Sequence, residues 1–121
     1  MQLTKPATYL AVGATGVPID IAFTTLASIG VGIVAAQAVG WVVAATWNWT
    51  WNRRKTWASD AEPLREWARY LGVDAGRLAV RVGVVAVVAS AVPGIIATVL
   101  GITAAAALGF VGFDRMVFSD A

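Results

Sequence analysis

The feature that most constrains the fold is the length of the apolar stretches. Four of them, at about 7–29, 31–51, 68–92 and 95–113, are each long enough to cross a hydrocarbon core of about 30 Å as a helix. Hydrophobic residues make up 59% of the 121 residues and charged residues only 13%, against roughly 45–50% and 25% in soluble domains. A soluble fold of this size could not bury so much apolar surface. We therefore expect an all-α membrane protein, residues 1–121, forming one domain of four transmembrane helices.

The positions of the cations predict how these helices are oriented. Lys5 precedes the first stretch, Arg53 to Lys55 follow the second, and Arg115 follows the fourth, whereas the turns at 30–32 and 93–94 carry no charge. Lysine and arginine favour the cytoplasmic side of a membrane. We expect both termini and the central linker, about 52–67, to lie in the cytoplasm, in a multi-pass protein of the cytoplasmic membrane. No cleavable signal peptide is evident.

The second apolar stretch ends in a segment, 47–57, that alternates tryptophans with polar and cationic residues. Indole rings prefer the level of the lipid headgroups, so an aromatic belt with a positive anchor explains the tryptophans and the cations. It does not explain Asn48 and Asn52, which lie four residues apart and share one face of a helix. We expect these asparagines to take part in binding.

The two halves of the sequence resemble each other. Residues 7–14 match residues 68–75 at five of eight positions, and Asn52-Arg53 at the end of the first half corresponds to Asp114-Arg115 at the end of the second. We infer two repeats of two spans each, about 7–57 and 68–118. Because both begin on the cytoplasmic side, the repeats are expected to be parallel.

Charged residues inside the predicted spans are the strongest sign of a functional site. A charge at the bilayer centre costs about 2.5–3.5 kcal/mol on insertion scales. Asp20 lies near the middle of the first span and Arg81 at the equivalent place in the third, so we expect a buried ion pair. Asp74, Arg77 and Arg81 share one helix face and would form a polar stripe leading inward. Two arginines on such a path suit a phosphate, which guanidinium binds in bidentate fashion.

Two plainer interpretations of these residues remain open. Arg77 can extend to the interface and be neutralised locally by Asp74. Pro18, two residues before Asp20, can either open its helix and free backbone groups for a ligand or simply kink it.

Several function classes are not supported. The chain has no histidine and no cysteine, and it shows no nucleophile, phosphate-loop or metal-ligand motif. We expect no enzyme, no cofactor, no metal site and, at a net charge of +2, no nucleic-acid partner. The acidic residues Asp60, Glu62 and Glu66 are interpreted as the solvated start of a helix, beginning near Ser59.

The sequence resembles the GtrA-like family. The resemblance rests on four short spans, on the pattern Asn-x-x-x-Asn-Arg-Arg-x-Thr-aromatic at 48–57, on a weaker echo at 114–118, and on Arg-Tyr-Leu at 69–71. It covers nearly the whole chain, and its most specific part is Asn48, Asn52, Arg53 and Arg54. The chain departs from the family pattern at Asp114, where a second asparagine is common, and in the charges of Asp74 and Arg81.

The resemblance implies a role in cell-surface polysaccharide or glycolipid synthesis, as a flippase that moves a polyprenyl-phosphate-linked sugar to the outer leaflet. A cytoplasmic ring would receive the phosphate and sugar, and Arg77 and Arg81 would carry the anion inward. The expected ring is Asn48, Asn52, Arg53, Arg54 and Arg115, and the expected charge partners are Asp20, Asp74 and Asp114.

Two other functions compete with this one. A membrane scaffold could recruit a glycosyltransferase through the segment 53–69 without transporting anything. A small multidrug-type exporter could use Asp20 to exchange protons with a cationic substrate, although the excess of arginine favours an anion. Because four short helices enclose little interior, we expect a homodimer.

Overall fold

The computed structural model describes residues 4–119, which are helical apart from short turns and one linker and contain no strand. The four long helices are α1 (Lys5–Gly30), α2 (Ile33–Trp51), α3 (Pro63–Val88) and α4 (Gly94–Gly112). A π-helical turn prolongs α2 as η1 (Asn52–Thr56) and α4 as η2 (Phe113–Val117). The all-α prediction is confirmed, and the four predicted stretches coincide with the four helices to within about five residues.

The helix starts follow from local capping chemistry. The Thr4 hydroxyl accepts a hydrogen bond from the Ala7 amide at the start of α1. The Glu62 carboxylate accepts hydrogen bonds from Leu64 and Arg65 at the start of α3, where Pro63 occupies the first position. This helix starts at Pro63 rather than near Ser59. Helix α1 continues through Pro18, so the proline does not open it.

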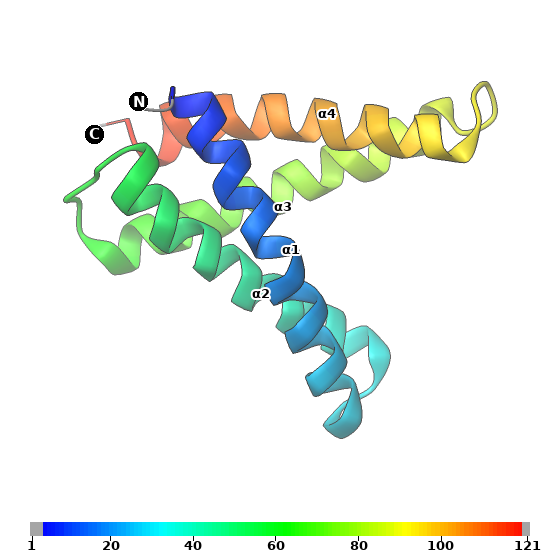
Figure 1. Ribbon diagram of the computed structural model, residues 1–121, viewed down its shortest axis with the longest axis horizontal. Coiled ribbons are helices and arrows are strands. Elements are labelled where there is room, and N and C mark those ends of the chain that lie inside the picture. The colour runs from blue at the N-terminus through cyan, green and yellow to red at the C-terminus, as the bar shows by residue number, and fades with distance from the viewer. Residues whose placement is uncertain (1–3, 120–121) are drawn as a thin grey trace.

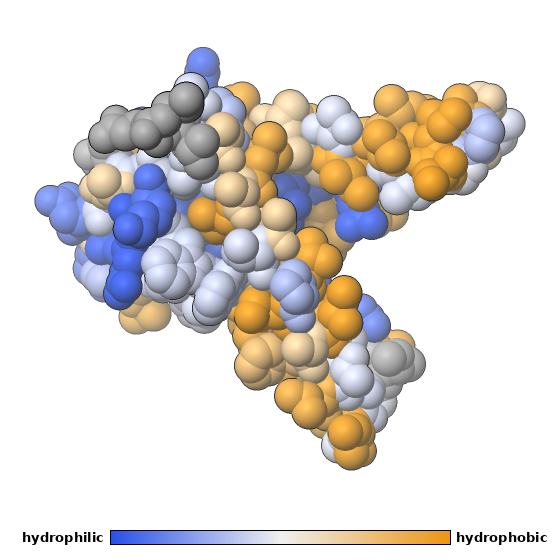
Figure 2. Space-filling model, in the orientation of Figure 1, coloured by the Kyte–Doolittle hydropathy of each residue, from blue (hydrophilic) through white to orange (hydrophobic). Residues whose placement is uncertain are grey.

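The helices form two hairpins, α1 with α2 and α3 with α4, which contact each other much less than their own members do. Figure 1 shows the hairpins side by side at the end where η1 and η2 lie and diverging toward their turns. Much of the surface of both hairpins is apolar toward their turns (Figure 2). Ile29 is 83% exposed and Val34 82% exposed, which a surrounding bilayer would explain.

Two of the described helices, α1 and α4 with η2, are long and apolar enough to cross a membrane. Helix α2 carries Gln37, Asn48 and several tryptophans, and α3 carries six charged residues, all within its first 19 positions. Their polar residues therefore weaken the same signal in α2 and α3. The count of four spans stays a prediction.

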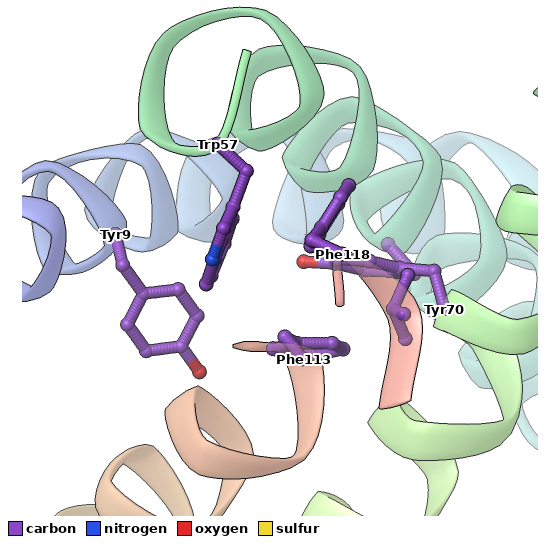
Figure 3. Packing of buried hydrophobic residues seen from close by; sticks show 7 residues of the cluster. Tyr9, Trp57, Tyr70, Phe113 and Phe118 are labelled. Carbon is purple, nitrogen blue, oxygen red and sulfur yellow. The ribbon is translucent and has the colours of Figure 1, made fainter. Parts of the chain in front are cut away.

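The two halves repeat in length and in contacts. Helices α1 and α3 have 26 residues each, α2 and α4 have 19, and each π-helical turn has 5. The Tyr9 and Trp57 rings meet at 6.2 Å and 67°, and their counterparts 61 residues later, Tyr70 and Phe118, meet at 6.2 Å and 66°. Trp57 stacks on its own counterpart Phe118 at 4.5 Å. Such reciprocal contacts are those of an approximate twofold axis through this aromatic cluster (Figure 3).

Candidate functional site

A cavity of about 390 Å³ lies between the two hairpins and is lined by residues of all four helices. Five of the ten predicted site residues line it: Asp20, Asn48, Asp74, Arg77 and Arg81. They come from α1, α2 and α3, so the structure brings together residues that lie up to 61 positions apart. We call this space the central cavity.

Asp74 is the most fully engaged group of the central cavity. Its side chain is buried, and its two oxygens accept hydrogen bonds from Trp41 Nε1 and from Arg77 Nε, both at 2.8 Å. Asp74 therefore neutralises Arg77 locally, as one of the two sequence interpretations held. Since this contact uses Nε, both terminal amino groups of Arg77 stay available for a ligand.

Asp20 and Arg81 occupy equivalent places but do not form the predicted ion pair. Asp20 lies against Gly40, and Arg81 against Gly101, 61 residues later in each case. Both line the central cavity. Among residues 4–119, however, Arg81 forms no ion pair, and Asp20 instead accepts a hydrogen bond from Thr24 at 3.0 Å. The prediction is wrong because the hairpins diverge toward their turns (Figure 1), and Asp20 packs against α2 of its own hairpin while Arg81 packs against α4 of the other.

Asn48 lines the same space, and its side-chain oxygen is buried against Gly16 of α1 without a hydrogen-bond partner. Its Oδ1 atom is the one buried side-chain oxygen or nitrogen of the described chain that makes no hydrogen bond. Helix α1 passes so close that a methyl group at Gly16 would collide with this amide. Leaving such an acceptor unsatisfied costs about 1–3 kcal/mol, so the site is better suited to holding a hydrogen-bond donor than to remaining empty.

The predicted cytoplasmic ring does not assemble into one site. Asn52 is fully buried, where it donates to the Tyr70 hydroxyl at 3.2 Å and accepts from Thr56 at 2.8 Å. Asn48 of α2 and Asn52, the first residue of η1, lie one turn apart, and the first contacts α1 whereas the second contacts α3. Asn52 is thus engaged in packing rather than facing a ligand.

The remaining ring residues are also separated. Arg53 forms a 2.6 Å ion pair with Glu66 and donates to the Ala61 carbonyl. Asp114 accepts a hydrogen bond from Trp57 Nε1 at 2.8 Å. Arg54 and Arg115 are exposed. The structure therefore offers no single site at which the residues of the predicted ring could bind a phosphate together.

Sequence reasoning missed Glu66. Interpreted as solvated, it is only 3% exposed, and its carboxylate accepts hydrogen bonds from Trp49, Arg53 and Ser59. A signal was present, because Glu66 lies four residues before Tyr70 and eight before Asp74, on the inward face of α3. The sequence offers no comparable signal for Trp41, which reaches Asp74 across 33 residues.

A second hollow, of about 610 Å³, lies on the outer face of α3 and α4 and is lined mostly by glycines and aliphatic side chains. Arg77 lines both this outer groove and the central cavity. At the equivalent positions of α1 and α2, Trp47 and Trp51 take the place of Leu108 and Gly112. The two hairpins therefore differ on their outer faces as well as in the cavity.

Comparison with known proteins gives one match. The family model described as GtrA/DPMS, transmembrane domain, matches residues 8–118. No curated protein and no solved structure matches the chain. The matched range includes nearly all of the four helices and every residue of the central cavity discussed above.

Proposed function

The chain belongs to the GtrA/DPMS transmembrane-domain family, and on this premise we propose that it moves a polyprenyl-phosphate-linked sugar across the cytoplasmic membrane. The match confirms the predicted resemblance. Together with the apolar helices α1 and α4 it makes the chain a membrane protein and points to glycolipid or polysaccharide synthesis.

The observation that carries the proposal is the pair of arginines in the central cavity. Arg77 and Arg81 lie one turn apart on α3, and their guanidinium groups keep unused donors. A phosphate supplies acceptor oxygens that match these donors. The prenyl chain would stay among lipid tails, because only the phosphate and the sugar need a polar path. The cargo crosses unchanged, so the proposal includes no enzymatic step.

The topology that we propose has four spans, with both termini and the linker in the cytoplasm. The distribution of cations supports it. We also propose a homodimer, since the diverging hairpins leave large apolar faces and the cavity of one chain is small for a sugar headgroup. Native mass spectrometry from a mild detergent would measure the oligomeric state and identify any retained lipid.

Transport can be tested in proteoliposomes that carry a polyprenyl phosphosugar on one side. Arrival of the sugar at the opposite leaflet is read from its oxidation by membrane-impermeant periodate. We expect Arg81→Met to abolish movement without affecting insertion. The control is Val82→Met, the neighbouring position on α3, which is 62% exposed. Undiminished transport by Arg81→Met would contradict the proposal.

A scaffold that recruits a glycosyltransferase is the second candidate, supported by the exposed cations of the linker and the start of α3. Arg54, Lys55, Arg65 and Arg69 are all exposed. On this alternative the intact chain would move no lipid in proteoliposomes and would instead co-purify with a glycosyltransferase, in a manner that depends on these residues.

A further inference from the structure

Apart from Asp74, whose two oxygens are already occupied by Trp41 and Arg77, the acceptors and donors of the central cavity come from different halves of the chain. The first half supplies an acceptor wall, made of the Asp20 carboxylate and the Asn48 carbonyl oxygen. The second half supplies a donor wall, made of Arg77 and Arg81. The glycine and the polar residue of this helix contact change places between the halves. Asn48 of α2 lies against Gly16 of α1 in the first half, whereas at the equivalent positions Arg77 of α3 lies against Gly109 of α4.

The two walls select different parts of a ligand. An ionised phosphate has only acceptor oxygens, so it can be bound by the arginines but would be repelled by Asp20. Asp20 and Asn48 Oδ1 need donors, and sugar hydroxyls are donors. A cation would also suit Asp20, but Arg81, which has no acidic partner among residues 4–119, would repel it across the same cavity.

The spacing of the groups supports this division. Gly16, beside Asn48, and Asp20 are four residues apart on α1, so the two acceptors are presented by successive turns. Arg77 and Arg81 are likewise four apart on α3. Successive turns place side chains about 5–6 Å apart, so each wall offers two contacts to a group the size of a sugar ring or a phosphate.

We propose that Asp20 and Asn48 form a sugar subsite, and that Asn48 helps to determine which sugar is accepted, while the arginines hold the phosphate. The inference rests on the proposed function and adds the orientation of the cargo within the site. Its central observation is the unpartnered oxygen of Asn48, which lies against Gly16 and would gain its hydrogen bond from a sugar hydroxyl when the amide turns toward the cavity.

The test compares lipids with and without a sugar. The full chain in nanodiscs is titrated with polyprenyl phosphate and with its glucose, mannose, galactose and N-acetylglucosamine conjugates, and binding is followed by native mass spectrometry. We expect Asn48→Ala to weaken binding of the preferred conjugate by about tenfold and to leave polyprenyl phosphate unaffected. Arg77→Met should weaken binding of both classes.

Matched variants separate recognition from folding. Gln37→Ala removes an exposed amide from the same helix, outside the central cavity, and should change no affinity. Asp20→Asn keeps the side-chain volume and an oxygen for Thr24, so it offers a second reading if Asn48→Ala is unstable. It should weaken binding of the sugar conjugate, whereas binding of polyprenyl phosphate should stay equal or strengthen, because the charge that repels the phosphate is removed.

Each outcome decides between the alternatives. Equal weakening of both lipid classes by Asn48→Ala and Asp20→Asn would overturn the sugar subsite, and so would unchanged binding of the conjugates. If the unmodified chain binds polyprenyl phosphate but prefers none of the conjugates, the subsite fails while the proposed function survives. If it binds none of the probes, both fail.

Discussion

The first hairpin presents Asp20 beside Gly40, whereas the second hairpin presents Arg81 beside Gly101 at the equivalent place. The helices, the turns and the aromatic contacts repeat, but the charge changes sign. Opposite charges recur at three pairs of positions that are 61 residues apart: Lys5 and Glu66, Asp20 and Arg81, and Arg53 and Asp114. The alignment of η1 with η2 thus pairs Asp114 with Arg53 and not, as predicted, with Asn52, and it leaves Arg54 and Arg115 as a pair of like charge. The comparison teaches that the repeat determines how the helices are arranged, and that the differences between the halves determine the chemistry of the central cavity.

A strictly symmetric cavity could not bind a phosphosugar in one orientation. Equal walls would face each other with like charges, which repel across a low-dielectric space. With the charges inverted, one wall accepts hydrogen bonds and the other donates them. The outer faces also differ: the first hairpin has a hollow of about 350 Å³ lined by Trp47 and Trp51, whereas the equivalent hollow on the second is larger, at about 610 Å³.

The largest effect is expected where the inverted charges meet across the halves. Glu66→Gln would leave Arg53, whose side chain is 17% exposed, without its ion-pair partner and would weaken the bonds to Trp49 and Ser59. We expect a loss of about 3 kcal/mol in the free energy of unfolding, at the low end for a buried pair that loses one member. Thermal unfolding in detergent, followed by tryptophan fluorescence, measures it.

The matched control is Lys5→Gln, which removes the charge at the equivalent position of α1. Lys5 is exposed and forms no ion pair among the described residues, so its loss should change stability by about 0.5 kcal/mol or less. Similar losses in the two variants would show that the hydrogen bonds and the ion pair of Glu66 do not stabilise the packing of the two halves on each other.

The helices and the repeat could be predicted from the sequence, because apolar stretches and turn residues are local signals. The sharing of one cavity by Asp20, Asp74, Arg77 and Arg81 also followed, from their spacing and from the repeat. The Asp20–Arg81 ion pair was predicted wrongly because its length depends on the angle between the hairpins. That angle is set by packing among residues such as Tyr9 and Phe113, which lie about a hundred positions apart.

The roles of the motif residues were beyond the sequence for a related reason. A local pattern shows that Asn52 and Arg53 share a segment with Asn48, but not what lies opposite each of them. Asn52 faces Tyr70, Arg53 faces Glu66, and only Asn48 faces the central cavity. These partners come from α3, and which of them meets which residue is decided by how the second half packs on the first.

An intermediate effect is expected from adding a methyl group to the close contact between α1 and α2. In Gly40→Ala, the new methyl group would collide with the Thr24 side chain and approach the Asp20 backbone carbonyl to 2.9 Å. Overpacking of this kind costs about 1–3 kcal/mol. At the equivalent Gly101 the Arg81 backbone carbonyl is about as close, at 3.0 Å, but the nearest side-chain atom is a Val85 methyl group at 2.9 Å rather than the colliding Thr24 hydroxyl, so Gly101→Ala should cost less.

Gly83→Ala provides the baseline for both variants. A methyl group there meets nothing within 4 Å, so the higher helix propensity of alanine should stabilise the protein by about 0.5–1 kcal/mol. Chemical unfolding of the three variants gives the ranking. Equal costs at Gly40 and Gly101 would show that the polar side chains of the first hairpin do not make its helix contact less tolerant.

The smallest expected effect is a difference in how the caps at the starts of α1 and α3 contribute to stability as the pH changes. The backbone amides of Arg65 and Leu64 donate to the Glu62 carboxylate and lower the pKa of Glu62 below its ordinary value of 4.5, whereas α1 is capped by the neutral hydroxyl of Thr4. Because the folded state favours the ionised carboxylate, its contribution is present above the ordinary pKa and is lost as the pH falls through the lowered value. The midpoint of thermal unfolding of Glu62→Gln should therefore lie slightly below that of the unmodified chain near neutral pH, and the gap should close in acid. The gap for Thr4→Ala should stay constant over the same range, and a gap for Glu62→Gln that is equally constant would mean that the two caps act alike.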